Sequence, residues 1–357
     1  MLHAVIMAGG SGTRFWPASR RSRPKQLLSL VGGEPLIRTT VDRILPLVPA
    51  ERIWVVTTEA TAEATREVLP ELAPGNVLVE PVGRDTAACA GFAAVVVRHS
   101  DPDGVCLVLP ADHVIRETFR FRRALAAGAE MVEQNRGLLT FGVRPTRPET
   151  GFGYLQVGRE HDSIDEWSVH ELARFVEKPD LETARQYLGE GGYLWNSGMF
   201  VWPVAELLGE IRRQLPMLAD GLDRIADALG SDRAGDVIEE IYPTLPKISV
   251  DYGIMEGAER CWTIPVDFPW SDVGAWPALG ELLECDESGN AVRGRTVVLD
   301  CRDCVLVGEG SVVAAAGVKD LIVVATPEAV LVLPATEAQR VKDIVAQLEE
   351  RDWDDVL

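Results

Sequence analysis

Residues 2–26 read LHAVIMAGGSGTRFWPASRRSRPKQ and join an apolar run to a glycine-rich turn. The short run Leu2–Ile6 is typical of a buried strand. The small residues that follow it are Ala8, Gly9, Gly10, Ser11 and Gly12. Glycines let the main chain turn sharply and place no Cβ atom in the way of a ligand. Because consecutive backbone N–H groups at such a turn can bind an anion, we predict a phosphate-binding loop over residues 8–13.

Two cations after the glycines strengthen this prediction, because Arg14 and Lys25 can neutralise a polyphosphate. The segment differs from the two commonest glycine loops. A Walker loop needs Gly-Lys-Ser/Thr, whereas Gly12 is followed by Thr13. The dinucleotide fingerprint needs a third glycine where Phe15 stands. By its glycines alone the segment could equally be a turn without a ligand, and the two cations argue against that alternative.

The composition of the 357-residue chain limits its class. With 46% hydrophobic and 25% charged residues, it matches globular proteins and not disordered ones. A net charge of −20 argues against a nucleic-acid partner, which would require a basic face. We find no basic leader and no run near the roughly 18 apolar residues of a membrane span. Six cysteines without a regular framework suggest reduced thiols. We therefore expect a cytoplasmic protein with no membrane partner.

Short apolar runs alternate with helical stretches through most of the chain and predict an α/β fold. The strand-like runs are 4–7, 53–57, 105–109 and 138–143. Their β-branched, continuously apolar character favours a mostly parallel sheet covered by helices on both faces. Ligands bind beyond the carboxyl ends of strands in such sheets, which is where residues 8–13 follow the first run.

The composition changes after residue 284, and we predict a domain boundary there, between 1–284 and 285–357. Short β runs separated by Gly, Asp and Pro follow the boundary, which suggests a small β-helix or curled sheet. A capping box at Thr336–Gln339 and an apolar face from Val341 to Leu348 predict a terminal helix. That helix would pack on the β tail or on a partner subunit, and we expect a homodimer.

Two isolated acids are candidate metal ligands. Asp112 stands just past the apolar run 105–109, and Asp272 lies in the aromatic loop 268–276. Mg²⁺ prefers one or two carboxylates and keeps its other positions for water and substrate oxygens. An Asp at a strand end is more often a cap or turn residue, so the alternative role is structural.

Residues suited to a sugar phosphate follow in the second half of the chain. Gly153 adjoins aromatic residues and lets a strand approach a ligand ring. Glu177 and Lys178 offer an acceptor for hydroxyl groups beside a cation for a phosphate, although adjacent charges are usually exposed ion pairs. Asn196 and Ser197 stand among aromatic residues, as in many carbohydrate sites, unless they only end a buried strand.

These sequence motifs, in this order, resemble those of the sugar-phosphate nucleotidyltransferases along nearly the whole chain. The loop 9–26 resembles the signature of the superfamily. The phrases Trp-Asn-Ser-Gly-Met-Phe (195–200) and Phe-Pro-Trp-Ser-Asp (268–272) resemble its mannose-1-phosphate guanylyltransferase branch. The resemblance implies a Rossmann-like catalytic domain over 1–284. It also implies transfer of GMP from GTP to α-D-mannose 1-phosphate, giving GDP-mannose and pyrophosphate, with Mg²⁺ as cofactor.

The resemblance also implies roles for individual residues. The phrase 80–87 would lie beside the base, with Glu80 accepting hydrogen bonds from guanine. Further nucleotide contacts would come from the loop 8–14, from Lys25 and Asp112, and from the members of this phrase, which are Gly83, Arg84, Asp85 and Thr86. Arg14 and Lys25 would act on the departing pyrophosphate and Lys178 on the sugar phosphate. Glu80 could instead anchor its loop, with the base read by main-chain groups near Ala8 and Gly83.

Two other functions stay open at this point. The chain could be a nucleotidyltransferase for another base or another hexose 1-phosphate. It could also be a catalytically silent subunit that binds nucleotide sugars, although the joint presence of Arg14, Lys25, Asp112, Lys178 and Asp272 argues against that. Longer, bifunctional family members carry a phosphomannose isomerase domain, for which this chain is too short.

Overall fold

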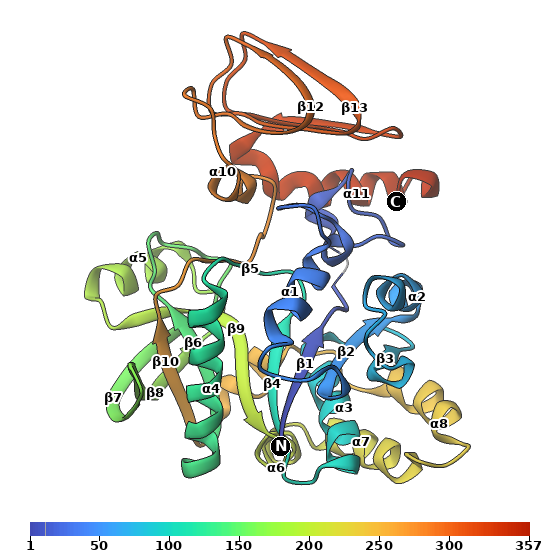
Figure 1. Ribbon diagram of the computed structural model, residues 1–357, viewed down its shortest axis with the longest axis vertical. Helices are drawn as coiled ribbons and strands as arrows, with labels where there is room; N and C mark the ends of the chain where they lie inside the picture. The colour runs from blue at the N-terminus through green and yellow to red at the C-terminus, as the bar shows by residue number, and fades with distance from the viewer. Residues whose placement is uncertain (11) are drawn as a thin grey trace.

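A nine-stranded sheet forms the centre of the protein (Figure 1), whose structure, a computed structural model, describes residues 1–10 and 12–357. The strand order is β3-β2-β1-β4-β9-β6-β10-β8-β7. The strands are β1 (Leu2–Met7), β2 (Ile53–Thr58), β3 (Val77–Glu80), β4 (Val105–Pro110), β6 (Leu138–Val143), β7 (Tyr154–Ile164), β8 (Trp167–Val176), β9 (Tyr193–Pro203) and β10 (Cys261–Val266). All four runs predicted as strands lie in this sheet.

The sheet is parallel in one half and mixed in the other. Strands β3, β2, β1 and β4 pair in parallel. Strand β9 then runs antiparallel to β4 and β6, the pair β6–β10 is parallel, and β8 and β7 are antiparallel at the edge. The α/β class is confirmed, with a parallel-rich sheet whose second half is more antiparallel than expected. Long hairpin-forming strands such as β7 and β8 need no crossover helix and therefore pair antiparallel.

Helices cover both faces of the sheet, as the apolar runs predict. Alternate residues of β1 enter different cores: Ala4 and Ile6 pack with α1 and α4, whereas Val5 packs with α3, α6 and α7. A strand buried on both faces must be apolar at every position. The helices of the catalytic region are α1 (Leu36–Ile44), α2 (Glu59–Val68), α3 (Asp85–Ser100), α4 (Thr118–Asn135), α5 (Leu181–Glu190), α6 (Val204–Gln214), α7 (Pro216–Ala228), α8 (Ala234–Ile241), α9 (Val250–Gly253) and α10 (Ala278–Leu282).

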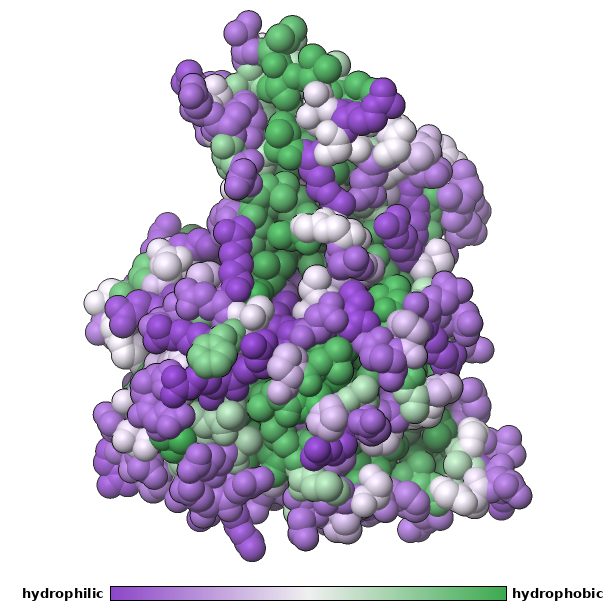
Figure 2. Space-filling view, in the orientation of Figure 1, coloured by the Kyte–Doolittle hydropathy of each residue, from purple (hydrophilic) through white to green (hydrophobic). Residues whose placement is uncertain are grey.

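The C-terminal strands form a second, smaller sheet above the first (Figure 1). Its strands are β12 (Ala291–Leu299), β13 (Val305–Ala316), β14 (Leu321–Ala325) and β15 (Val330–Pro334). The pairs β12–β13 and β13–β14 are parallel, and β15 returns antiparallel. Figure 2 shows this part as a narrow lobe rising from the broad one, with hydrophobic residues at their junction. A two-stranded sheet of β5 (Val114–Ile115) and β11 (Trp270–Ser271) lies near the junction.

The terminal helix α11 (Val341–Glu349) lies between the small sheet and the N-terminal loop (Figure 1). The capping box expected at Thr336 is absent from the structure as described, because Ala335–Arg340 forms a 3₁₀ helix without a side-chain cap. The predicted apolar face is present, with Val341, Val345 and Leu348 buried. It packs into one core with Phe15 and Trp276, so this core joins the two lobes. None of the described helices is long and apolar enough to cross a membrane.

Candidate active site

Two adjoining cavities lie at the carboxyl ends of the parallel strands. The larger has a volume of about 670 Å³ and the smaller about 410 Å³. Both are lined by Gly10, Asp112 and Asp272. A volume of 300–1,000 Å³ is usual for small-molecule sites, so the pair can hold two substrates end to end.

Most of the predicted site residues line one of the two cavities. The larger cavity is lined by Ala8, Gly9, Gly10, Glu80, Gly83, Asp85, Thr86, Asp112, Gly153, Glu177, Asn196, Ser197 and Asp272. The smaller cavity is lined by Gly10, Gly12, Thr13, Arg14, Lys25, Asp112 and Asp272. Arg84 and Lys178 line neither cavity, and Ser11 lies outside the described residues.

The glycine loop is close-packed at two points. Gly12 has a φ of 60°, and a Cβ atom there would lie 2.8 Å from the backbone nitrogen of Lys25. A Cβ atom on Gly9 would lie 2.8 Å from the Glu80 carboxylate. Both distances are too short for real atoms. At Gly12 the neighbour is backbone and φ is positive, so glycine is required there, whereas a side chain at Gly9 would displace the Glu80 carboxylate. The close approach brings the loop against the base side at Gly9 and against Lys25 at Gly12.

Lys25 connects the two predicted metal ligands. Its ammonium group donates to the Asp112 carboxylate at 2.6 Å and to the Asp272 backbone carbonyl at 2.6 Å. Its side chain is buried and lies over the Phe15 ring. Burial alone would raise the pKa of Asp112, but the Lys25 charge outweighs it and the pKa is lowered. Asp112 is therefore an ionised carboxylate near neutral pH.

The second acid, Asp272, has a different environment. Burial raises its pKa, and the neighbouring Asp112 raises it further, against the opposing charge of Lys25. Among the described residues, no donor lies within hydrogen-bond distance of the Asp272 carboxylate. A buried acid beside a second carboxylate fits a divalent cation as a ligand. Within residues 1–10 and 12–357 no larger group of acidic, His or Cys side chains gathers for a metal.

The part of the larger cavity predicted for the base contains a buried carboxylate. Glu80, at the end of β3, accepts a hydrogen bond from the hydroxyl of Tyr242. Burial raises the pKa of Glu80 to about 7, although the Tyr242 hydrogen bond opposes that shift. Glu80 thus has one oxygen held by Tyr242 and the other near Gly9, facing the cavity.

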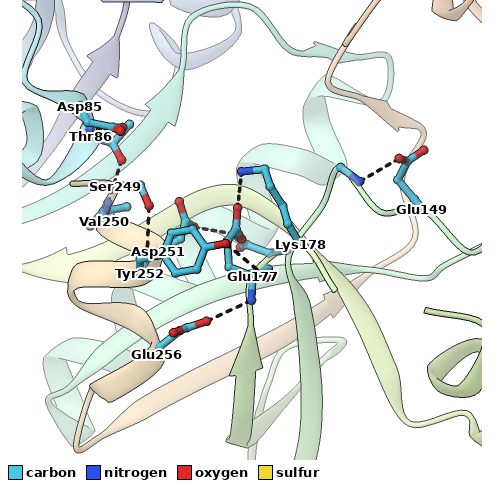
Figure 3. A network of polar contacts seen from close by, with 12 residues as sticks. Asp85, Thr86, Glu149, Glu177, Lys178, Ser249, Val250, Asp251, Tyr252 and Glu256 are labelled. Carbon is cyan, nitrogen blue, oxygen red and sulfur yellow. Dashed lines mark hydrogen bonds and ion pairs between the residues drawn. The ribbon is translucent and has the colours of Figure 1, made fainter. Parts of the chain in front are cut away.

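The end of the larger cavity predicted for the sugar phosphate is formed by residues of β9, of the turn after β8 and of α9 (Figure 3). Asn196 donates to Asp251 at 2.9 Å, and Lys178 pairs with Glu177 at 2.5 Å. The Glu177 side chain is buried, whereas that of Lys178 is 55% exposed. Burial raises the pKa of Asp251 to about 7, and the nearby Glu177 adds to the shift. Two carboxyl groups therefore face this end of the cavity, where hydroxyl groups of a sugar could donate to them.

Two predicted sugar contacts also have structural partners. The Asn196 amide oxygen accepts from Thr140 at 3.0 Å, and the Ser197 hydroxyl donates to the Phe141 carbonyl at 2.7 Å. Both residues line the cavity, but these bonds occupy part of their polar capacity. Their role in binding sugar hydroxyls stays a prediction, and holding Asp251 in place is a second role for Asn196.

A short helix connects the two ends of the site. Ser249 caps α9 by accepting from the Tyr252 amide at 3.3 Å. The Val250 amide donates to the Thr86 hydroxyl at 2.8 Å, which ties α9 to the base-side phrase (Figure 3). Thr86 therefore has an anchoring contact as well as a place on the cavity wall.

Three residues at the site were not predicted as contacts. Asp251 and Lys247 line the larger cavity, and Tyr242 holds Glu80. The chain has 30 arginines but only five lysines, so the rarity of lysine could have indicated Lys247 as a candidate contact. No sequence feature indicated Asp251 or Tyr242 as contacts, because a short helix with acids and a buried tyrosine are common structural features.

Comparisons with known proteins agree with this geometry. The sequence family described as "Nucleotidyl transferase" matches residues 3–288, and "MannoseP isomerase/GMP-like beta-helix domain" matches residues 294–348. The mannose-1-phosphate guanylyltransferase of Escherichia coli (strain K12) is 37% identical over 353 residues, 98% of this chain and 73% of that protein. The Klebsiella pneumoniae protein of the same name is 38% identical over 358 residues, 98% of this chain and 74% of that one.

Solved structures support the same fold. One from Thermus thermophilus, described as a mannose-1-phosphate geranyltransferase, has a TM-score of 0.86 and 38% identity. It covers 98% of this chain and 99% of that one. A Helicobacter pylori structure described as mannose-6-phosphate isomerase has a TM-score of 0.60 at 24% identity, over 76% of this chain and 99% of that one, and shows the fold alone.

Proposed function

This chain belongs to the nucleotidyl transferase family, and we propose that it is a mannose-1-phosphate guanylyltransferase. It transfers GMP from GTP to α-D-mannose 1-phosphate and releases pyrophosphate. The activity is the one named for the curated relatives that match nearly the whole chain. The observation that carries the proposal is the pair of cavities that share Gly10, Asp112 and Asp272, because the reacting phosphates of two substrates must meet at one point.

The reaction needs alignment more than acid–base chemistry. An oxygen of the sugar phosphate attacks the α-phosphorus, and the bond from that phosphorus to the pyrophosphate oxygen breaks. The attacking phosphate has a second pKa of about 6, so it is already mostly dianionic near neutral pH and needs no general base. Positioning of the two substrates and neutralisation of phosphate charge then account for the acceleration of the reaction. His113, which lies on both cavity walls, fits this account, because burial lowers its pKa to about 4 and keeps it neutral.

Each part of the site has a role in this proposal. The glycine loop and Arg14 bind the triphosphate. Lys25 lies beside the α-phosphate and the acids, and Lys178 reaches the sugar phosphate by leaving its exposed pair with Glu177. The residues proposed for the base are Glu80, Gly83, Arg84, Asp85 and Thr86. The residues proposed for the sugar phosphate are Gly153, Glu177, Lys178, Asn196, Ser197 and Asp272.

Asp112 and Asp272 are the residues that would hold a divalent cation, for which Mg²⁺ is our proposal. A bound cation would neutralise phosphate charge and orient oxygens of both substrates. Asp112 stays ionised beside Lys25, so it can serve as a ligand without releasing a proton. A cation next to Asp272 would oppose the rise in the pKa of that carboxyl group and favour its ionised form.

A pyrophosphate-release assay tests the activity directly. Four nucleoside triphosphates would be combined with mannose, glucose and galactose 1-phosphate. We expect GTP with mannose 1-phosphate to have the highest kcat/KM. A preference for another base or another hexose would support the neighbouring nucleotidyltransferase activity, and release with no pair would support a silent binding subunit.

We also propose a homodimer in the cytoplasm, with the domain boundary at residue 284. Exposed apolar side chains on the small sheet support the dimer, and they are Val297, Leu299, Val312, Val330 and Val332. The six free cysteines, five of them buried, support a reducing compartment. Light scattering of the purified chain tests the first point, and a single monomeric species would contradict it.

A further inference from the structure

A lysine of the terminal helix lines the phosphate side of the active site. The smaller cavity is formed by loop residues such as Gly12 and Arg14, by the acids Asp112 and Asp272, and by Lys342 of α11. Lys342 is separated in sequence from all the other residues of this wall and belongs to the C-terminal lobe. The cavity therefore lies between the two lobes.

Lys342 is available for a ligand. Its side chain is exposed, and within residues 1–10 and 12–357 it forms no ion pair. By contrast, its neighbour Arg340 pairs with Glu337 at 3.6 Å and with Asp343 at 3.9 Å. A cation without a partner in a chain of net charge −20 adds positive potential to the cavity it faces.

The helix that carries Lys342 and the C-terminal residues after it are fixed at several points to residues 16–21, which follow the glycine loop. The Trp16 indole donates to the Val356 carbonyl at 2.8 Å. Arg21 pairs with Glu349 at 2.9 Å and with Asp354 at 3.1 Å. The position of α11 relative to the loop is therefore set by buried packing and by polar contacts.

These contacts hold Lys342 on the wall of the smaller cavity, into which the β- and γ-phosphates would extend in the proposed reaction. The base pocket at Glu80 and the shared wall at Asp112 fix the direction of the nucleotide from the larger cavity to the smaller one. Pyrophosphate carries several negative charges, and Lys25 is already paired with Asp112. Arg14 lines the smaller cavity as well, and a second cation there would neutralise more of the pyrophosphate charge.

We propose that Lys342 binds the β- and γ-phosphates of the nucleotide and the departing pyrophosphate, so that the C-terminal lobe completes the active site. This inference rests on the proposed function, because it assigns the smaller cavity to the leaving group. No bond to Lys342 forms or breaks in the reaction. The ammonium group donates hydrogen bonds and neutralises charge as the pyrophosphate leaves.

The test compares Lys342→Ala and Lys342→Arg with Arg340→Ala, a matched control on the same stretch. Lys342→Ala should raise the KM for GTP, and the KM for pyrophosphate in the reverse reaction, by about tenfold, a value for a charged hydrogen bond reduced by exposure. The KM for mannose 1-phosphate and the inhibition constant of GMP should not change, since neither contains the β- or γ-phosphate. Lys342→Arg should restore most of the loss, and Arg340→Ala should resemble the wild type.

Two results would overturn the inference. An unchanged KM for pyrophosphate in Lys342→Ala would remove the lysine from the site. An equal loss of GMP and GTP binding would assign it to the shape of the loop instead. If the wild type made no GDP-mannose, the proposed function would fail, but calorimetry of pyrophosphate binding to the wild type and to Lys342→Ala would still decide the role of Lys342.

Discussion

The hydroxyl of Tyr242 donates to the carboxylate of Glu80 across 162 residues of sequence. Tyr242 is fully buried beside Phe92, with ring centroids 5.5 Å apart, so its hydroxyl is held in a fixed direction. One oxygen of Glu80 is thereby occupied and the other faces Gly9 and the cavity. The proposed guanine reader is a carboxylate in a fixed orientation, which makes its chemistry testable.

The first prediction concerns selectivity for the base. Ionised Glu80 can accept from guanine N1–H and the N2 amino group, whereas adenine would place an acceptor against it. Glu80→Gln should lower kcat/KM for GTP by about a hundredfold, which corresponds to roughly 2–4 kcal/mol for leaving a buried polar group poorly paired. The ratio of GTP to ATP efficiency should fall with it. A wild-type ratio in the variant would assign the selectivity to main-chain groups near Ala8 and Gly83.

A second prediction concerns pH. The pKa of Glu80 is raised to about 7, so its carboxylate becomes protonated as the pH falls below 7 and can no longer accept both bonds. Efficiency with GTP should therefore decline below pH 7. In Tyr242→Phe, which removes the bond that opposes the shift, the decline should begin at a higher pH. The pH profile of kcat/KM measures both, with the exposed Tyr252→Phe as control. A profile that did not move in Tyr242→Phe would exclude Glu80 as the titrating group.

The third prediction concerns the two acids at the junction of the cavities. Asp112→Asn and Asp272→Asn should each abolish most turnover at saturating Mg²⁺, because only a carboxylate supplies the charge that a hard cation requires. Both variants should stay folded, as circular dichroism would show. The matched control is Asp267→Asn, an exposed acid of the same loop that pairs with Arg120. Near-normal turnover in Asp112→Asn would remove that residue from the metal site.

The fourth prediction separates two lysines. Lys25→Ala should mainly weaken the use of GTP, because Lys25 lies in the phosphate cavity beside Asp112. Lys178→Ala should mainly raise the KM for mannose 1-phosphate, because Lys178 lies beside Glu177 at the sugar end. Steady-state kinetics with each substrate varied, and exposed Lys319→Ala as control, measure the difference. Loss of affinity for the same substrate in both variants would contradict this division.

The fifth prediction concerns Asp251. Its pKa is raised to about 7 in the folded protein, above the ordinary value of 3.8, so the protonated form is favoured by folding. The resulting stability is present below pH 4 and is lost as the pH rises to about 7, at up to about 1.4 kcal/mol per pH unit. Asp251→Asn should remove this dependence and so gain stability relative to the wild type at pH 8, while its KM for mannose 1-phosphate rises.

Thermal unfolding between pH 4 and pH 8 measures how Asp251 changes the pH dependence of stability, with exposed Asp236→Asn as control. The slopes for Asp251→Asn and the wild type should differ over this interval. Parallel curves would mean that Asp251 is ionised at all these pH values, held so by Lys178, whose own pKa is raised by Glu177 and Asp251 against the effect of burial.

Features that depend on neighbouring residues could be predicted from the amino-acid sequence. The continuous apolar runs specified buried strands, and the glycines specified the loop, because strand formation and a left-handed backbone at Gly12 are local properties. The order of the motifs was enough to indicate the family. The terminal helix was predicted from its apolar face, although its start was placed too early.

Contacts between residues that are far apart in the sequence could be seen only in the folded protein. Lys25 pairs with Asp112 across 87 residues, Asn196 holds Asp251 across 55, and Lys342 of the other lobe lines the same cavity as Gly12. The sequence also did not indicate that Lys178 is exposed or that Arg84 lines neither cavity. The partner and the pKa of a charged side chain depend on the groups that folding brings within a few ångströms of it. Coulomb energy depends on the distance between charges, and the cost of desolvation depends on burial, so neither can be read from sequence spacing.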